Sequence, residues 1–155
     1  MTEIPLGRSG YVALVDDADV PLVAPYRWHM TRGRGRLYAR GDTRAQQIFM
    51  HRLILGATPG IQTDHKNNDG LDNRRENIRL ATPSQNNANR HVVTGASRFR
   101  GVVRHGKNWA AKIMVNNRRF HVGTFRTEEE AARAYDGAAI EAWGEFARPN
   151  FLGVS

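Results

Sequence analysis

Cysteine is missing from all 155 residues of this sequence. Its absence excludes disulfide bonds, thiolate zinc sites and catalysis by a thiol, and it agrees with a reducing compartment such as the cytoplasm. The sequence also lacks an apolar run near the roughly 18 residues of a membrane helix, and its first residues show no basic stretch followed by an apolar one. We therefore expect a cytoplasmic protein with neither a membrane span nor a signal peptide.

Acidic residues are missing from one long stretch. Between Asn77 and Thr127 there is no Asp or Glu, yet the stretch carries ten Lys or Arg, and the whole chain has a formal net charge of +8. Acidic residues then follow at Glu128, Glu129, Glu130, Asp136, Glu141 and Glu145. This segregation predicts one basic and one acidic face, and a basic face favours an anionic polymer as partner.

The first third of the chain alternates short apolar runs with turn residues. A chain of this length can form one domain or two small ones. Residues 4–55 predict short strands, with a strand over 11–15, a turn at 16–19 and a hairpin that joins 37–40 to 47–51.

Two later segments are more strongly patterned. Residues 61–90 predict a strand ending in Asp64-His65, a polar loop, a return strand over 77–81, and a helix that begins at Thr82-Pro83. Residues 98–126 predict a three-stranded antiparallel meander with a tight turn at Asn116-Asn117.

The last segment predicts one helix. Thr127 to Glu130 form a capping box, and an Ala-rich helix follows. Its small face is expected to consist of Ala131, Ala134, Tyr135, Ala138 and Ala142, which would let the helix lie close to the sheet.

Asp64-His65 is followed by Asn77 after twelve residues and by Asn86 after nine more. Hydrolysis of a phosphodiester needs a base for the attacking water and stabilisation of the leaving oxygen. A histidine suits the base, because its ordinary pKa is about 6.5. The oxygens of Asp64 and Asn86 suit Mg2+ or Mn2+ rather than zinc. Neighbouring strand residues point to opposite faces, so Asp64 and His65 can share a site only where the strand ends.

Simpler interpretations exist for each of these residues alone. An Asp-His pair is most often a surface or capping pair, and Asn77 and Asn86 are each most often turn or cap residues. Asp72 is interpreted as a turn or cap residue, and His51 as a structural or phosphate-facing residue in an apolar strand.

Together, these residues and their neighbours resemble the HNH endonuclease family, which has the ββα-metal nuclease fold. The resemblance is carried by residues 50–53, 64–79 and 85–89. It is closest in kind to the phage and intron-encoded homing branch, in which the last His of the motif is replaced by Asn. The resemblance implies that Asp64 and Asn86 hold one divalent cation, Mg2+ or Mn2+, against the scissile phosphate. It also implies that His65 is the general base and that Asn77 braces the hairpin and orients His65.

Residues 98–151 resemble the AP2 DNA-binding domain, which lays a three-stranded sheet in the major groove. The matching segments are 99–102, 109–113, 122–125, 129–136 and 150–151. The resemblance implies DNA contacts from Arg100, Arg104, Trp109 and Lys112, and more loosely from Arg118 and Arg119. His121 stands where the family usually has Trp, and Lys112 where an acidic residue is common, which favours contact with phosphates over a base code.

We therefore expect an α+β protein. Short β-hairpins precede a ββα-metal (HNH) nuclease core within residues 1–90, whose motif spans 50–90, and residues 91–97 form a linker. An AP2-type three-stranded antiparallel sheet packed on one helix occupies 98–151.

The expected function is metal-dependent cleavage of duplex DNA, by nicking or by cutting both strands, of the homing type and targeted by the AP2 domain. We expect a phage-encoded protein acting in the cytoplasm of a bacterial host cell, as a monomer or a dimer. The alternative is a DNA-binding regulator that keeps the HNH fold as a silent scaffold. An RNA-binding accessory protein is a weaker third interpretation, because neither segment has the exposed aromatic pattern of single-strand binders.

Overall fold

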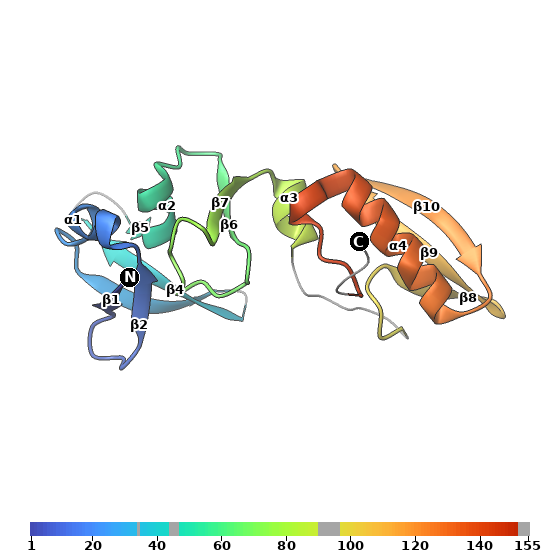
Figure 1. Cartoon of the computed structure of the whole chain (residues 1–155), viewed down its shortest axis with the longest axis horizontal. Coiled ribbons are helices and arrows are strands. Elements are labelled where there is room, and N and C mark those ends of the chain that lie inside the picture. The colour runs from blue at the N-terminus through green and yellow to red at the C-terminus, as the bar shows by residue number, and fades with distance from the viewer. Residues whose placement is uncertain (34, 44–46, 90–96, 152–155) are drawn as a thin grey trace. The chain divides into compact units, whose positions relative to one another are not determined.

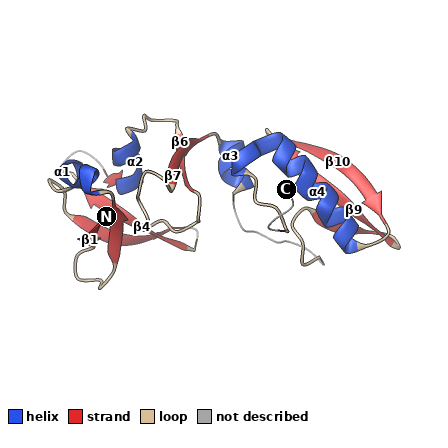
Figure 2. Cartoon of the chain, in the orientation of Figure 1, coloured by secondary structure: helices blue, strands red, loops and turns tan. Residues whose placement is uncertain are grey.

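The computed structural model describes residues 1–33, 35–43, 47–89 and 97–151. It shows a mixed α/β protein with several small antiparallel sheets and few helices, which confirms the α+β class (Figures 1 and 2). The chain divides into two units, Met1–Thr82 and Pro83–Ser155. The expected linker at 91–97 lies, apart from Ser97, outside the described residues.

The described part of the first unit is built from short antiparallel strands. One pair joins β1 (Thr2–Pro5) to β2 (Val12–Val15), and another joins β6 (Gln62–His65) to β7 (Ile78–Ala81). A three-stranded sheet has the order β3 (Trp28–Gly33), β4 (Arg36–Asp42), β5 (Gln47–Phe49). The helices of this unit are the 3-10 helix η1 (Asp17–Asp19), α1 (Val20–Val23) and α2 (Met50–Leu55).

The second helix corrects the prediction for residues 47–51. The pattern predicts a strand through His51, but β5 ends at Phe49 and α2 begins at Met50. A short apolar run does not by itself distinguish a strand from a buried helical turn. Gly56 ends α2 in the left-handed conformation, with φ of 61°, as glycine commonly does after a helix.

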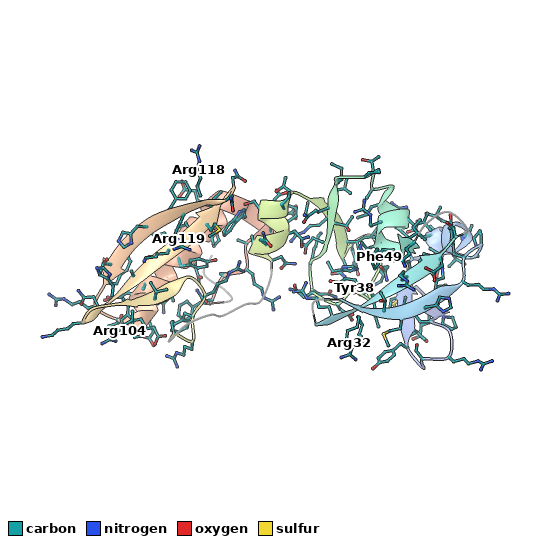
Figure 3. All side chains as sticks on the ribbon, turned by 180° about the vertical axis from the view of Figure 1, so that it is seen from behind. Arg32, Tyr38, Phe49, Arg104, Arg118 and Arg119 are labelled. Atoms are coloured by element: carbon teal, nitrogen blue, oxygen red, sulfur yellow. The ribbon has the colours of Figure 1, made fainter. Side chains whose placement is uncertain are left out.

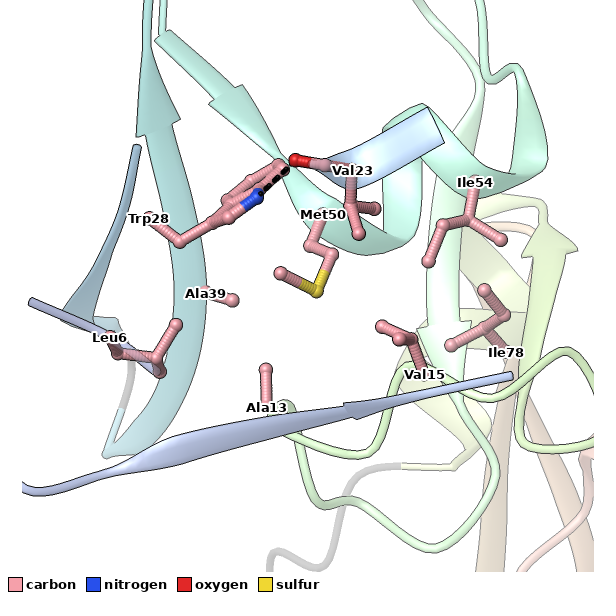
Figure 4. Close-up of a cluster of buried hydrophobic side chains, with 9 residues drawn as sticks. All are labelled: Leu6, Ala13, Val15, Val23, Trp28, Ala39, Met50, Ile54 and Ile78. Carbon is pink, nitrogen blue, oxygen red and sulfur yellow. Dashed lines mark hydrogen bonds between the residues drawn. The ribbon is translucent and has the colours of Figure 1, made fainter. Parts of the chain in front are cut away.

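Nine buried hydrophobic side chains form the core of the first unit (Figure 4). They are Leu6, Ala13, Val15, Val23, Trp28, Ala39, Met50, Ile54 and Ile78. The indole of Trp28 fills one side of this core, and its Nε1 donates a hydrogen bond to the carbonyl oxygen of Val23 at 2.9 Å. The core therefore draws on the sheets, on both α-helices and on the β6–β7 hairpin.

The loop between β6 and β7 is fastened to β2. Leu14 makes a parallel bridge with Asp72. Its N–H donates to the carbonyl of Leu71 and its carbonyl accepts from the N–H of Asn73, each at 2.8 Å. Because Leu14 lies between the buried residues Ala13 and Val15, the loop is held by a strand that is itself part of the core.

The second unit contains the predicted meander. The strands β8 (Val102–His105), β9 (Asn108–Val115) and β10 (Arg118–Phe125) form one antiparallel sheet in the order β10-β9-β8. Asn116 and Asn117 have φ of 48° and 64°, which is the turn geometry that joins hairpin strands tightly. α4 (Glu128–Trp143) begins with the predicted capping box at Thr127 and ends in the 3-10 helix η2 (Gly144–Phe146).

The buried face of α4 differs from the predicted stripe. It consists of Ala131, Ala132, Tyr135, Asp136, Ala139 and Trp143. Ala142 is exposed, while Ala134 and Ala138 are half-buried. Alanine occurs on both sides of this helix, so the large residues Tyr135 and Trp143 decide its rotation. Gly101 allows the ring of Tyr135 to approach the sheet, since a Cβ there would lie 2.0 Å from that ring.

The order strand, loop, strand, helix is present, and its helix is α3 (Pro83–Ala88). α3 belongs to the second unit. The Ser84 Oγ accepts hydrogen bonds from the Trp143 indole at 3.1 Å and from the Asn116 N–H at 3.2 Å. The guanidinium of Arg100 donates to the carbonyls of Asn87 and Ala88 at the end of α3. α3 is thus attached at both ends to the unit that carries the meander.

We predict that Trp143→Phe loosens α3 without unfolding the sheet. The substitution keeps an aromatic ring but removes the hydrogen bond to Ser84, worth about 1 kcal/mol. The backbone amides of Ala88 and Asn89 should then exchange about fivefold faster in hydrogen-exchange measurements. Ile140→Ala, on the exposed side of α4, is the matched control. Equal exchange in both variants would contradict the role of Ser84 and Trp143 in holding α3.

Candidate active site

Asp64 and His65 are the last two residues of β6. In the antiparallel pairing with β7, Asp64 lies opposite Arg79 and His65 lies opposite Ile78. Both side chains are buried, with Asp64 3% and His65 5% exposed. β6 ends at His65, which is the condition under which the two neighbouring side chains can share a site.

Asn77 joins the two ends of the loop between β6 and β7. Its Oδ1 accepts from the N–H of Asn67 at 3.0 Å, and its Nδ2 donates to the carbonyl of Asp72 at 2.7 Å. The backbone adds a bond from the N–H of Lys66 to the Asn77 carbonyl at 2.8 Å. These bonds hold the residues directly after His65 in one conformation.

Asp72 is part of the same loop rather than a neighbour of Asp64 in a ligand cluster. Arg74 binds both of its carboxylate oxygens at 2.8 Å, and the Nδ2 of Asn67 donates to Oδ2 at 2.9 Å. The hydrogen bonds from Arg74 lower the pKa of the Asp72 carboxyl. These contacts favour the interpretation of Asp72 as a turn residue.

His65 lies among aromatic rings contributed by β4 and α2. The centroids of the His65 and His51 rings are 4.8 Å apart in an edge-to-face arrangement. Tyr38 lies 6.0 Å from His65 and 5.9 Å from His51, also between ring centroids. Burial lowers the pKa of His65, and a hydrogen bond with the Asn73 side chain opposes that shift. The net shift favours the neutral form of His65, which is the state in which an imidazole can accept a proton.

His51 is a buried helix residue. Its pKa is lowered to about 3, mainly by burial and to a smaller extent by the nearby His65 and Arg52. Its location in α2, against Tyr38, Phe49 and His65, agrees with the structural interpretation of this residue. Sequence reasoning did not connect His51 to His65, because their contact joins α2 to β6 across the fold.

Gly70 brings the loop against β4. A Cβ at this position would lie 2.2 Å from the Leu37 carbonyl oxygen and 2.5 Å from the Tyr38 ring. Only a glycine therefore permits this approach. Tyr38 thus contacts both the loop that follows His65 and the His65 ring, and Figure 3 shows it beside Phe49 in the first unit.

Arg79 forms an ion pair with Asp64. Its Nε donates to Asp64 Oδ2 at 3.0 Å, and its Nη2 lies 2.9 Å from the same oxygen. The two side chains are 10% and 1% exposed. Sequence reasoning missed Arg79, although a hairpin that places His65 opposite Ile78 necessarily places Asp64 opposite Arg79.

Asn86, the other expected metal ligand, lies on α3 in the second unit. The donor chemistry of Asp64 and Asn86, a carboxylate and an amide oxygen, suits a hard cation such as Mg2+. In the first unit, however, Asp64 already has a guanidinium partner. Among the described residues there is no group of three or more His, Asp or Glu that could hold a metal ion. The oxygen donors of Asp64 and Asn86 are thus of the type that binds Mg2+. Of these two expected ligands, the first unit contains only Asp64.

The six predicted DNA-contacting residues do not all lie on one face of the meander. Lys112 lies opposite His121 and Met114 opposite Arg119, so these four share one face of the sheet. The alternate residues Ala111 and Ile113 are buried on the other face, and α4 packs against β9. His121 and Met114 were not among the predicted contacts, and the period of two from Lys112 would have indicated Met114.

The other four predicted residues lie elsewhere. Arg104 pairs with Trp109 in register, with its guanidinium 4.8 Å from the ring centroid. Arg118 lies opposite Val115 and is exposed, and Figure 3 labels it with Arg104 and Arg119 on this sheet. Arg100 binds the end of α3, as described above.

Comparisons with known proteins find two families along the chain. The sequence profile described as "HNH endonuclease" matches residues 49–88, and the profile described as "AP2 domain" matches residues 97–145. An uncharacterized HNH endonuclease of Acanthamoeba polyphaga mimivirus is 32% identical over 148 residues, which are 94% of this chain and 78% of the viral protein.

Two ethylene-responsive transcription factors of Arabidopsis thaliana are 49% and 51% identical over 61 residues. These 61 residues are 37% of this chain but only 14% and 11% of the plant proteins. The likeness to the transcription factors is therefore confined to the AP2 domain.

A nuclease segment followed by a DNA-binding domain is the class of protein that these matches define. The chain belongs to the HNH endonuclease family, and it is a nuclease with an AP2 domain after its HNH segment. Within the described residues, no helix has both the length and the apolar character needed to cross a membrane.

We predict that acid destabilises the first unit through its buried histidines. His51 has a pKa of about 3 when folded and about 6.5 when unfolded. Between these values only the unfolded state takes up the proton. The contribution of neutral His51 to the free energy of unfolding is therefore fully present above pH 6.5 and is lost as the pH drops towards 3. The loss is up to about 1.4 kcal/mol per pH unit. His51→Phe should reduce this slope, as measured from urea unfolding of the β6 and β7 amide signals by NMR.

Met50→Leu is the control for this prediction. It changes packing in the same helix without changing a titratable group, so it should shift stability and leave the slope intact. A slope equal to that of the wild type in His51→Phe would show that His51 is not the group responsible.

We predict that Gly70→Ala destabilises the first unit by about 1–3 kcal/mol, the usual cost of overpacking. The added Cβ must displace the loop from Leu37 and Tyr38. Gly137→Ala on α4 is the matched control, because a Cβ there meets nothing within 4 Å and should stabilise the helix by about 0.5–1 kcal/mol. Scanning calorimetry distinguishes the two, and a tolerated Gly70→Ala would refute the tight approach.

Proposed function

We propose that this nuclease is a metal-dependent endonuclease that hydrolyses phosphodiester bonds of duplex DNA at sites chosen by its AP2 domain. The observation that carries the proposal is a buried His65 beside Asp64 at the end of β6, with the following loop held by Asn77. The functional division remains a nuclease part over 1–90 and a DNA-binding part over 98–151.

In this proposal His65 accepts the proton of the attacking water. Burial lowers the pKa of His65, which favours the neutral imidazole that can accept this proton. The hydrogen bonds of Asn77 hold the residues after His65. Asn77 is therefore a positioning residue for the base, in agreement with the role that the resemblance implies.

Asp64 and Asn86 would hold the divalent cation, Mg2+ or Mn2+. When bound, the cation would act as a Lewis acid and stabilise negative charge on the leaving oxygen. The buried Asp64 carboxylate contributes its negative charge where water competes least.

The AP2 domain would bring the duplex to the nuclease. Lys112 and Arg119 share one face of the meander. Arg104, Arg118 and Arg119 are exposed, and Lys112 is half-buried. Positive side chains of this kind bind phosphates and release counterions, so binding should weaken as salt rises. The proposal also includes a homing role and action in the cytoplasm of the host cell. A viral origin is supported by the similar nuclease of a giant virus.

We predict that His65→Ala lowers the rate of DNA cleavage at least 100-fold, the lower end of what a general base contributes. The full chain is incubated with a duplex library in Mg2+ or Mn2+, and the cut ends are sequenced. This readout gives activity, cut site and strand together. Binding of the same library by His65→Ala, measured by filter retention, should stay within twofold of the wild type.

His29→Ala is the matched control, because His29 is exposed on β3 in the same unit. It should cut and bind like the wild type. Persistent cleavage by His65→Ala would remove His65 from the role of base. Binding without cleavage in every divalent metal tested would support the DNA-binding regulator instead.

A further inference from the structure

The Asp64 carboxylate is compensated by an internal cation. Its side chain is 1% exposed, and a buried carboxylate is tolerated only when it is paired or hydrogen-bonded. The strand register puts Arg79 directly opposite, and Nε and Nη2 of Arg79 both approach Oδ2. The pair therefore carries no net charge before any other ligand arrives.

A divalent cation on Asp64 would meet this arginine at close range. The cation and the guanidinium would then share one buried carboxylate, where charges are poorly screened. One carboxylate shared with an arginine is a weak site for such a cation. The described residues offer no cluster of three or more His, Asp or Glu around it.

A DNA phosphate would change this balance in two ways. It brings an additional negative charge and oxygen ligands, which Mg2+ commonly takes from its substrate. It also offers Arg79 a second anionic partner, and guanidinium groups bind phosphate oxygens well.

We propose that Arg79 acts as the internal counter-cation of Asp64 and makes binding of the divalent cation depend on DNA. Without DNA, Arg79 opposes the cation; with a phosphate present, the cation binds. Because coupling between two ligands is reciprocal, the cation strengthens DNA binding by the same factor. This inference rests on the proposed function, since it takes Asp64 as a metal ligand.

The test measures Mn2+ binding rather than cleavage. Free Mn2+ is followed by electron paramagnetic resonance in the full chain, without DNA and with a mixed-sequence duplex at low salt. His65→Ala is used as the background in both arms so that the duplex stays intact. Mn2+ should bind at least tenfold more tightly when DNA is present. Equal affinity in the two arms would overturn the proposal, and this comparison needs no change at Arg79.

Adding Arg79→Met to this background tests the arginine itself. It removes the positive charge and keeps the side-chain length, so Mn2+ should bind the DNA-free protein at least tenfold more tightly. Mn2+ should also raise the melting temperature of this variant more than that of its parent. Arg79→Lys keeps the charge and should behave like the parent. Unchanged or weaker Mn2+ binding by Arg79→Met would mean that Arg79 supports the cation site, and the proposal would be wrong.

Arg75→Met is the matched control. Arg75 pairs with both oxygens of buried Asp19 at 2.8 and 2.7 Å in the same unit. Its loss should lower stability and leave Mn2+ binding unchanged; tighter Mn2+ binding in this variant too would overturn the assignment to Arg79.

The outcomes also separate this inference from the proposed function. If the wild type cuts DNA but the His65→Ala protein binds Mn2+ equally well with and without DNA, only the proposed role of Arg79 is contradicted. A protein that never cuts DNA but shows DNA-dependent Mn2+ binding contradicts only the proposed endonuclease activity.

Discussion

The burial of the Asp64 carboxylate is the constraint around which the nuclease segment is organised. A buried carboxylate that loses its partner destabilises a protein by about 3–5 kcal/mol. The β6–β7 register meets this constraint by placing Arg79 opposite Asp64. The same register fixes His65 opposite Ile78, which belongs to the hydrophobic core. The chemistry of the site is thus tied to the packing of the first unit, since the hairpin cannot slip by one residue without exposing Ile78.

The environment of the neighbouring His65 is formed by a different part of the fold. Its ring lies against His51 and Tyr38, which come from α2 and β4. Removal from water lowers the pKa of His65 and favours the neutral base. Gly70 allows the loop after His65 to lie close to β4. Asn77 connects two parts of the same loop through its side-chain hydrogen bonds. Asp64 is therefore stabilised by a charge across the hairpin, and the pKa of His65 is lowered by burial among rings.

Much of the local structure could be predicted because it depends on neighbouring residues. The Asn116-Asn117 turn and the Thr127 capping box are short-range features, and both are present. Predictions failed where distant contacts decide. His51 lies in a helix instead of a strand, because a short apolar run fits either. The buried face of α4 is rotated from the predicted stripe, because Tyr135 and Trp143 outweigh alanines that occur on both sides.

The sequence by itself determined which candidate reactive groups this nuclease has, where its turns and helix caps lie, and that no acidic residue lies between Asn77 and Thr127. Those features follow from residue identity and spacing along the chain. Only the tertiary structure decided what surrounds the reactive groups: Arg79 at Asp64, two rings at His65, and the attachment of α3, with Asn86, to the second unit. The physical reason is that charge compensation and desolvation depend on side chains brought together across strands and helices, which spacing in the sequence does not specify.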